Sequence, residues 1–265
     1  MKKLFTLLLA AIMVLSLAAC DAKHDAEYIK GNGKVLVGIT IYEPMNYYDE
    51  AGNLTGFDTE FAQAVCEKLG LKAEFVEINW DTKEVELNAK SIDCIWNGMT
   101  ITEERAANMS ISVPYVKNAQ VIVVKADSAI VATADLIGKT VVAEIGSAGE
   151  AQIKGEDANA DLAQAEYVGM AKQTDCLMEV KAGTADAAVL DWTLAKSMVG
   201  EGTDFADLKM VADLELATEE YGIAFRKDSN FTAEVDAAIK ALVADGTLPA
   251  LAEKYGLALA PAIAG

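Results

Sequence analysis

Two successive runs of alternating apolar strands and amphipathic helices constrain this chain more than any other feature. The first run places strands at 35–39, 72–78 and 93–96. The second run places strands at 140–143, 165–168 and 186–190. Strands that alternate with helices pair in parallel, because each helix returns the chain to the edge where the strand began. The 265 residues therefore favour an α/β fold with two lobes.

Residues just beyond the strand ends are the candidate site residues, because open α/β sheets bind ligands at the carboxyl ends of their strands. These segments are 39–46, 79–81, 97–105, 144–150 and 190–192. Between the first two strands, Asp58 is expected to cap a helix that ends at Gly70.

The charge balance and the rare residue types exclude several kinds of chemistry. The chain has 41 acidic and 22 basic residues, so nucleic acid is not an expected partner. Its single histidine, His24, lies near the N-terminus, which leaves no histidine for catalysis or metal ligation elsewhere. Cys66, Cys94 and Cys176 lie in apolar surroundings and are expected to fill the core, with a disulfide as the alternative. We expect no metal site and no cofactor.

The N-terminus has the features of an export signal. Two lysines precede an apolar stretch at 4–17 that is too short to span a bilayer. The stretch ends in Leu-Ala-Ala before Cys20, which resembles the lipobox of bacterial lipoproteins and implies a palmitate-type lipid anchor on Cys20. The alternative is ordinary cleavage, with Cys20 incidental. Residues 1–20 are thus expected to be a signal peptide with a lipobox, and 21–33 a polar tether.

The segment 98–105, Gly-Met-Thr-Ile-Thr-Glu-Glu-Arg, follows a predicted strand and has the features of an anion site. Thr102 is expected to start a helix, so that free backbone N–H groups and the Arg105 guanidinium face the same point. Arg105 and Arg226 are the only arginines in the chain, and the planar fork of arginine suits a carboxylate. The alternative is a solvated arginine that pairs with a glutamate on the helix surface.

Several motifs stand in the order and spacing found in one protein family. They are Pro44, Gly56-Phe57-Asp58, Ile92-Asp93, the segment 98–105, Ser112-x-Pro114-Tyr115, Ala185-Asp186-Ala187 and Tyr221-Gly222-Ile223-Ala224. With these motifs the chain resembles the extracytoplasmic substrate-binding proteins of polar amino-acid ABC importers, solute-binding protein family 3. The resemblance covers nearly the whole chain after the export signal.

This resemblance implies the type II periplasmic-binding-protein-like fold, in which two crossover hinge strands join two α/β lobes. Lobe one would comprise 34–121 and 222–265, lobe two 122–221, and the hinge strands would lie near 119–125 and 219–223. The family implies that a free L-amino acid binds between the lobes by hinge closure and passes to an ABC permease subunit. We expect a monomer without enzymatic activity, held by its lipid anchor alone at the outer face of the cytoplasmic membrane or in the periplasm.

Carried over position by position, the resemblance also implies the roles of single residues. Arg105 and Thr100 would bind the α-carboxylate, while the Gly98 carbonyl and Asp191 would bind the α-ammonium. Met99 belongs to the same block of candidate ligand-binding residues. For Asp191, the alternative is a cap on the helix that follows it.

The remaining candidates would contact the rest of the ligand. Tyr42 and Trp80 fall where the family sandwiches the ligand side chain, although Tyr42 could instead pack in the core. Ser147, Ala148 and Gly149 match a loop whose backbone amides contact the ligand, with a plain strand-to-helix turn as the alternative. Ile39 stands where relatives that bind basic amino acids have an acid, so a neutral amino acid is favoured.

Two other functions stay open at this point. A ligand-sensing receptor ectodomain would use the same two lobes. A cyclohexadienyl-dehydratase-like enzyme on this scaffold would need an acid or base in the cleft, for which Glu43 and Glu144 are the candidates.

Overall fold

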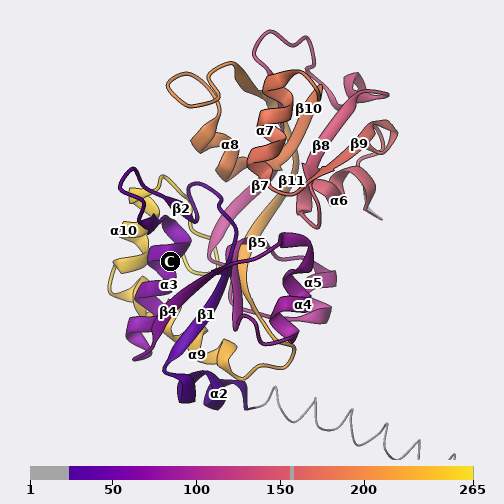
Figure 1. Cartoon of the computed structure of the whole chain (residues 1–265). Helices are drawn as coiled ribbons and strands as arrows, with labels where there is room; N and C mark the ends of the chain where they lie inside the picture. Colours follow the sequence, from indigo (N-terminus) through magenta and orange to yellow (C-terminus); the bar gives the residue numbers. More distant parts are fainter. Residues whose placement is uncertain (1–23, 156–157, 265) are drawn as a thin grey trace, which may run out of the picture.

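The computed structural model describes residues 24–155 and 158–264, which form two lobes joined by two long strands (Figure 1). We define lobe one as residues 24–115 and 226–264, and lobe two as residues 126–207. The joining strands are β7 (Val116–Lys125) and β11 (Leu208–Phe225). The expected signal peptide at 1–20, with Cys20, lies outside the described residues.

Lobe one is built on three parallel strands. β1 (Lys34–Ile39) pairs with β4 (Lys72–Glu77) on one side and with β5 (Cys94–Thr100) on the other. The lobe's longer helices are α3 (Phe57–Lys68), α9 (Phe231–Ala244) and α10 (Thr247–Lys254). Its shorter elements are β2 (Tyr47–Tyr48), β3 (Leu54–Thr55), α4 (Lys83–Asn88), α5 (Glu103–Asn108) and β6 (Ser110–Ile111).

Lobe two repeats this plan with a second parallel set. β8 (Thr140–Glu144) pairs with β9 (Glu166–Met170) and with β10 (Ala187–Asp191). Its helices are α6 (Ala148–Lys154), α7 (Gln173–Ala182) and α8 (Trp192–Met198). Both alternating runs of the sequence therefore form the parallel units that their patterns predict.

The two joining strands lie antiparallel to each other in the middle of one continuous sheet. The strand order is β4-β1-β5-β11-β7-β10-β8-β9, so β11 adjoins lobe one and β7 adjoins lobe two. The β7–β11 register is interrupted between Met210 and Glu215. The expected crossovers near 119–125 and 219–223 fall within these longer strands. The expected fold class, two α/β lobes with two crossover strands, is confirmed.

The three cysteines of the described chain are buried and unpaired, as expected of core-filling residues. Cys66, Cys94 and Cys176 form no disulfide within the described residues. Burial raises the pKa of the Cys66 thiol to about 12, because the thiolate would lose its hydration. These side chains therefore act as small apolar groups at neutral pH.

The structure corrects the expected tether at 21–33. Residues 25–32 form helix α2 (Asp25–Asn32), and Gly33 ends it with a positive φ of 68°. Ala26 and Ile29 pack into the lobe-one core, where each is at most 3% exposed. The segment folds against lobe one because these apolar residues share one face of the helix.

A buried ion cluster fixes α2 to the rest of lobe one. Arg226 lies 2.7 Å from the Asp25 carboxylate and 2.9 Å from the Asp93 carboxylate, and all three side chains are buried. Arg226 also donates to the carbonyls of Leu87 (3.2 Å) and Ile92 (2.7 Å). The cluster thereby joins the N-terminal helix, the start of β5 and the end of β11.

Among the described residues, the helices are all too short or too polar to cross a membrane. The apolar stretch at 4–17 lies outside the described residues, so this observation does not cover it.

Candidate functional site

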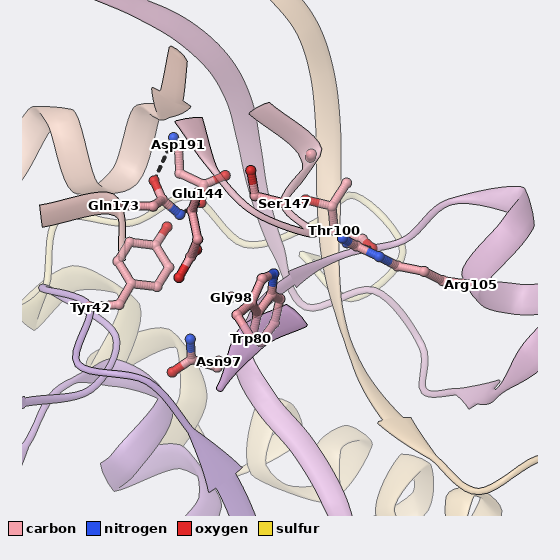
Figure 2. Close-up of a pocket in the computed structure, with 11 residues that line it drawn as sticks. Tyr42, Trp80, Asn97, Gly98, Thr100, Arg105, Glu144, Ser147, Gln173 and Asp191 are labelled. Carbon is pink, nitrogen blue, oxygen red and sulfur yellow. Dashed lines mark hydrogen bonds between the residues drawn. The ribbon is translucent and has the colours of Figure 1, made fainter. Parts of the chain in front are cut away.

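A narrow cavity lies between the two lobes (Figure 2). Lobe one lines it with residues at or after strand ends: Tyr42, Trp80, Asn97, Gly98, Thr100 and Arg105. Lobe two lines it with Glu144, Ser147, Ala148, Gln173 and Asp191. Its position follows from the strand directions, because the carboxyl ends of β5, β8 and β10 all face the space between the lobes.

Arg105 reaches this cavity from the first turn of α5. Thr102 caps that helix by accepting a hydrogen bond from the Arg105 N–H at 3.2 Å. One guanidinium nitrogen donates to the Thr100 carbonyl at 2.8 Å, and the other donates to the Gly146 carbonyl of lobe two at 3.0 Å. Only 8% of the residue is exposed, so the alternative of a solvated surface arginine is wrong. Burial lowers its pKa, and the nearby Glu219 and Asp191 carboxylates oppose that effect.

Asp191 enters the cavity from the other lobe, at the end of β10. Its carboxylate accepts hydrogen bonds from the side-chain amides of Asn118 (2.7 Å), Gln120 (2.6 Å) and Gln173. Its own backbone N–H donates to the Gln173 side chain at 3.0 Å, the dashed contact in Figure 2. The residue stands at the start of α8 but makes no side-chain cap there. The alternative capping role is therefore wrong.

Glu219, on β11, is a member of the cluster that sequence reasoning missed. It accepts hydrogen bonds from Thr100 Oγ1 (2.9 Å), Asn118 Nδ2 (2.5 Å) and Gln120 Nε2 (2.8 Å). Burial, and next the charge of Asp191, raise its pKa to about 7. Its one sequence signal is its place two residues before the Tyr221-Gly222-Ile223-Ala224 motif.

Two aromatic residues of lobe one form walls of the cavity. The Tyr42 hydroxyl contacts the hydroxyls of Thr193, in lobe two, and of Tyr221, the latter at 2.6 Å. Trp80 is 5% exposed, and the Lys83 ammonium lies 4.8 Å from its ring centroid. Tyr42 also packs in the lobe-one core, as the alternative considered from sequence expected, and it lines the cavity as well.

Gly98 forms part of the cavity lining, at a position that only glycine fits. Its φ is 54°, and a Cβ atom there would come within 2.6 Å of the Tyr42 ring. The Gly98 N–H donates to the Asp58 carboxylate at 2.7 Å, and the Tyr115 hydroxyl donates to the same oxygen at 3.0 Å. Asp58 therefore does not cap α3, which begins after Gly56 without a side-chain cap. It holds the end of β5 from beneath.

The buried Asp58 carboxyl gives a stability effect that depends on pH. Burial raises its pKa to about 7, so the folded state holds a proton that the unfolded chain releases near pH 4. The stabilising effect of this proton is complete below pH 4 and is lost as the pH rises through 7, at up to about 1.4 kcal/mol per pH unit. Asp58→Asn removes the titration, so the free energy of unfolding of this variant, relative to the natural protein, is expected to rise from pH 5 to pH 7. Urea unfolding at both pH values measures it, and an unchanged difference would contradict the assignment.

The structure does not bring two of the expected residues to the cavity lining. Met99 lies between Gly98 and Thr100 on β5, and its side chain turns into an apolar cluster with Leu87 and Ile95. Gly149 lies beneath the loop, where a Cβ atom would come within 2.7 Å of the Val189 carbonyl. Ser147 and Ala148 line the cavity, and Ser147 caps α6 by accepting from the Glu150 N–H at 3.1 Å.

Three more lining residues were absent from the expected ligand-binding set. Asn97 is fixed by the Thr40 hydroxyl and backbone, and Gln173 is fixed by Asp191. Glu144 ends β8 and is 4% exposed, and burial raises its pKa to about 8. Within the described residues, no group of three or more His, Cys, Asp or Glu side chains could hold a metal ion.

These features define a two-lobed α/β protein with a polar cavity between its lobes, the architecture of a binding protein for small polar ligands. The chain belongs to the bacterial extracellular solute-binding proteins, family 3, whose family model matches residues 35–258. The family expected from the sequence motifs is therefore confirmed.

Individual relatives agree with this assignment. The arginine-binding extracellular protein ArtP of Bacillus subtilis (strain 168) is 30% identical over 265 residues, covering 96% of this chain and 98% of ArtP. The structure of holo ArgBP from T. maritima has a TM-score of 0.74 at 35% identity, covering 87% of this chain and 99% of that one. The ancestral amino-acid-binding protein AncCDT-1, a precursor of cyclohexadienyl dehydratase, has a TM-score of 0.76 at 32% identity, covering 86% and 98%.

Proposed function

We propose that this protein binds one free L-amino acid between its lobes and presents it to an ABC permease. The observation that carries the proposal is that Arg105 and Asp191, from different lobes, line the same cavity. A zwitterion needs a donor fork at one end and a carboxylate at the other, both removed from water. The curated relative ArtP, named as an arginine-binding protein, supports a ligand of this class.

Each group of the ligand then has a partner. The Arg105 guanidinium and Thr100 take the α-carboxylate, and the backbone at Ser147 and Ala148 closes over it from lobe two. Asp191 and the Gly98 carbonyl take the α-ammonium. Tyr42 and Trp80 enclose the side chain.

Hinge closure follows from how the site is divided. Several contacts link the lobes directly, including Arg105 to Gly146 at 3.0 Å and Lys172 to Glu77 at 2.8 Å. A ligand that touches both lobes makes more contacts in the closed state than in an open one, so it shifts the population toward closure. β7 and β11 are the natural hinge, because they are the strands that join the lobes.

A thermal-shift screen of the purified protein with the twenty amino acids tests this function. A ligand that binds the folded state alone raises the unfolding midpoint by mass action, by an amount equivalent to about 2.7 kcal/mol at a hundred times its Kd. We expect at least one amino acid to raise the midpoint clearly. A flat response to all twenty would remove the basis of the proposal.

We further propose that the protein acts as a monomer held at the outer face of the membrane by acyl chains on Cys20. The export signal and the lipobox resemblance support this anchor. Mass spectrometry of the mature N-terminus tests it, since an unmodified N-terminus at any residue other than Cys20 would contradict it.

The dehydratase alternative rested on two acids, which the structure separates. Glu144 lines the cavity. Glu43 is not among the lining residues, and its carboxylate accepts a hydrogen bond of 3.1 Å from the Ser197 hydroxyl. AncCDT-1 is itself described as an amino-acid-binding protein. Binding is thus the function that the site supports best.

A further inference from the structure

One buried carboxylate in the cavity has no partner in the binding scheme above. Glu144 points into the cavity from the end of β8, with Tyr42 on one side and Trp80 on the other (Figure 2). It is 4% exposed, and in the described part of the chain only burial and the charges of neighbouring groups act on its carboxyl, with no hydrogen-bond donor among them. Buried carboxylates are normally hydrogen-bonded or paired, because an isolated charge is costly away from water.

The neighbouring cation does not satisfy this carboxylate. Lys83 is near enough to lower the pKa of Glu144 somewhat, against the larger effect of burial. Its ammonium, however, donates to the Trp80 carbonyl at 3.0 Å and to the Gly146 carbonyl at 3.1 Å. Glu144 is therefore left to be paired by whatever occupies the cavity.

The charges of the site indicate what that partner must be. Arg105 matches the α-carboxylate and Asp191 matches the α-ammonium, whereas Glu219 is not among the residues that line the cavity. An amino acid with a neutral side chain would leave the Glu144 carboxyl protonated, because ionising it in a buried site without a counter-charge is costly. A cationic side chain would pair with it, and the aromatic faces of Tyr42 and Trp80 would favour the same charge.

We propose that Glu144 is the specificity-determining residue of this site and that it selects amino acids with a basic side chain. The inference rests on the proposed function. It replaces the expectation of a neutral ligand, which depended on Ile39. The Ile39 side chain is 2% exposed and packs in the lobe-one core, away from the cavity lining.

Isothermal titration of the purified full chain with L-arginine, L-lysine and L-glutamine tests this proposal. We expect the better basic ligand to bind at least about tenfold more tightly than L-glutamine, whose side chain is polar but neutral. Glu144→Gln is expected to weaken that basic ligand about tenfold or more and to change L-glutamine binding less than about threefold. Glu144→Asp keeps the charge, so it is expected to keep the preference for basic ligands even where Glu144→Gln folds poorly.

Glu74→Gln is the matched control, because it removes one negative charge from an exposed salt bridge with Lys34. This variant is expected to bind every ligand as the natural protein does. A natural protein that prefers L-glutamine would overturn the proposal, as would a Glu144→Gln variant that weakens all ligands equally. If the natural protein bound neither the basic amino acids nor L-glutamine, the result would instead contradict the proposed function itself.

Discussion

Replacing Arg105 with alanine is expected to weaken amino-acid binding by at least about 100-fold, or about 2.7 kcal/mol. The guanidinium is the one arginine fork in the cavity, and its burial strengthens a charge-assisted bond to a carboxylate. Its removal also frees the Thr100 and Gly146 carbonyls, which it joins across the two lobes. Isothermal titration with the ligand that gives the largest thermal shift measures the effect.

The Arg105→Lys variant distinguishes the contribution of the positive charge from that of the two parallel hydrogen bonds of the guanidinium. Lysine keeps the positive charge but cannot make two parallel hydrogen bonds, so we expect an affinity between those of the alanine variant and the natural protein. The unfolding midpoints of both variants without ligand show whether the folded state is retained. A loss of less than about tenfold in the alanine variant would mean that Arg105 does not hold the α-carboxylate.

The second arginine is expected to affect stability and not binding. Arg226→Met should destabilise the protein by about 3–5 kcal/mol, because it leaves Asp25 and Asp93 buried without their cation. At roughly 2–4 °C per kcal/mol for a domain of this size class, the unfolding midpoint should fall by about 6–20 °C. Differential scanning calorimetry measures it.

The two arginines are controls for each other. Arg226 lies at the end of β11 against α2, outside the cavity lining, so its variant should bind the amino acid within about threefold of the natural affinity while still folded. A midpoint shift below about 3 °C would show that the buried cluster is not needed to hold α2. If the unfolding midpoint fell as expected and the folded variant also lost much of its affinity for the amino acid, the cluster would be acting on the binding site.

The sequence predicted the site most reliably where the signal is local. The 98–105 block is continuous, so its helix start, its cap at Thr102 and the inward-facing Arg105 follow from neighbouring residues. The strands of both runs were likewise within a few residues of their observed bounds. Short-range periodicity reports which face of a strand or helix is buried, and this is enough to place an element.

Helix α2 shows where local signal was insufficient. Half of its residues are polar or charged and its last two are a Gly and an Asn, which favours a flexible tether by composition. The helix is stabilised instead by Ile29 in the core and by Arg226, about 200 positions further along the chain. A contact at that separation leaves no trace in the local pattern.

The carboxylates of the site differ in the same respect, because one was predictable from the sequence and the others depend on the tertiary structure. Asp191 was found through a family motif position, whereas Glu219 and the selecting role proposed for Glu144 depend on which strands become neighbours. Gln120 and Asn118 on β7 bring Asp191 and Glu219 together, because β7 lies between β10 and β11 in the sheet. Met99 and Gly149 were expected in the site, but the backbone turns them into the lobe interiors.

The amino-acid sequence by itself determined the two α/β lobes, the arginine at a strand end and the family to which they belong. Only the tertiary structure decided which acids share the cavity, that Ile39 faces the core, and that Glu144 is buried there with no hydrogen-bond donor among the described residues. The physical reason is range: helix and strand formation depend on residues a few positions apart, whereas burial and charge pairing depend on strands that meet after the chain has folded.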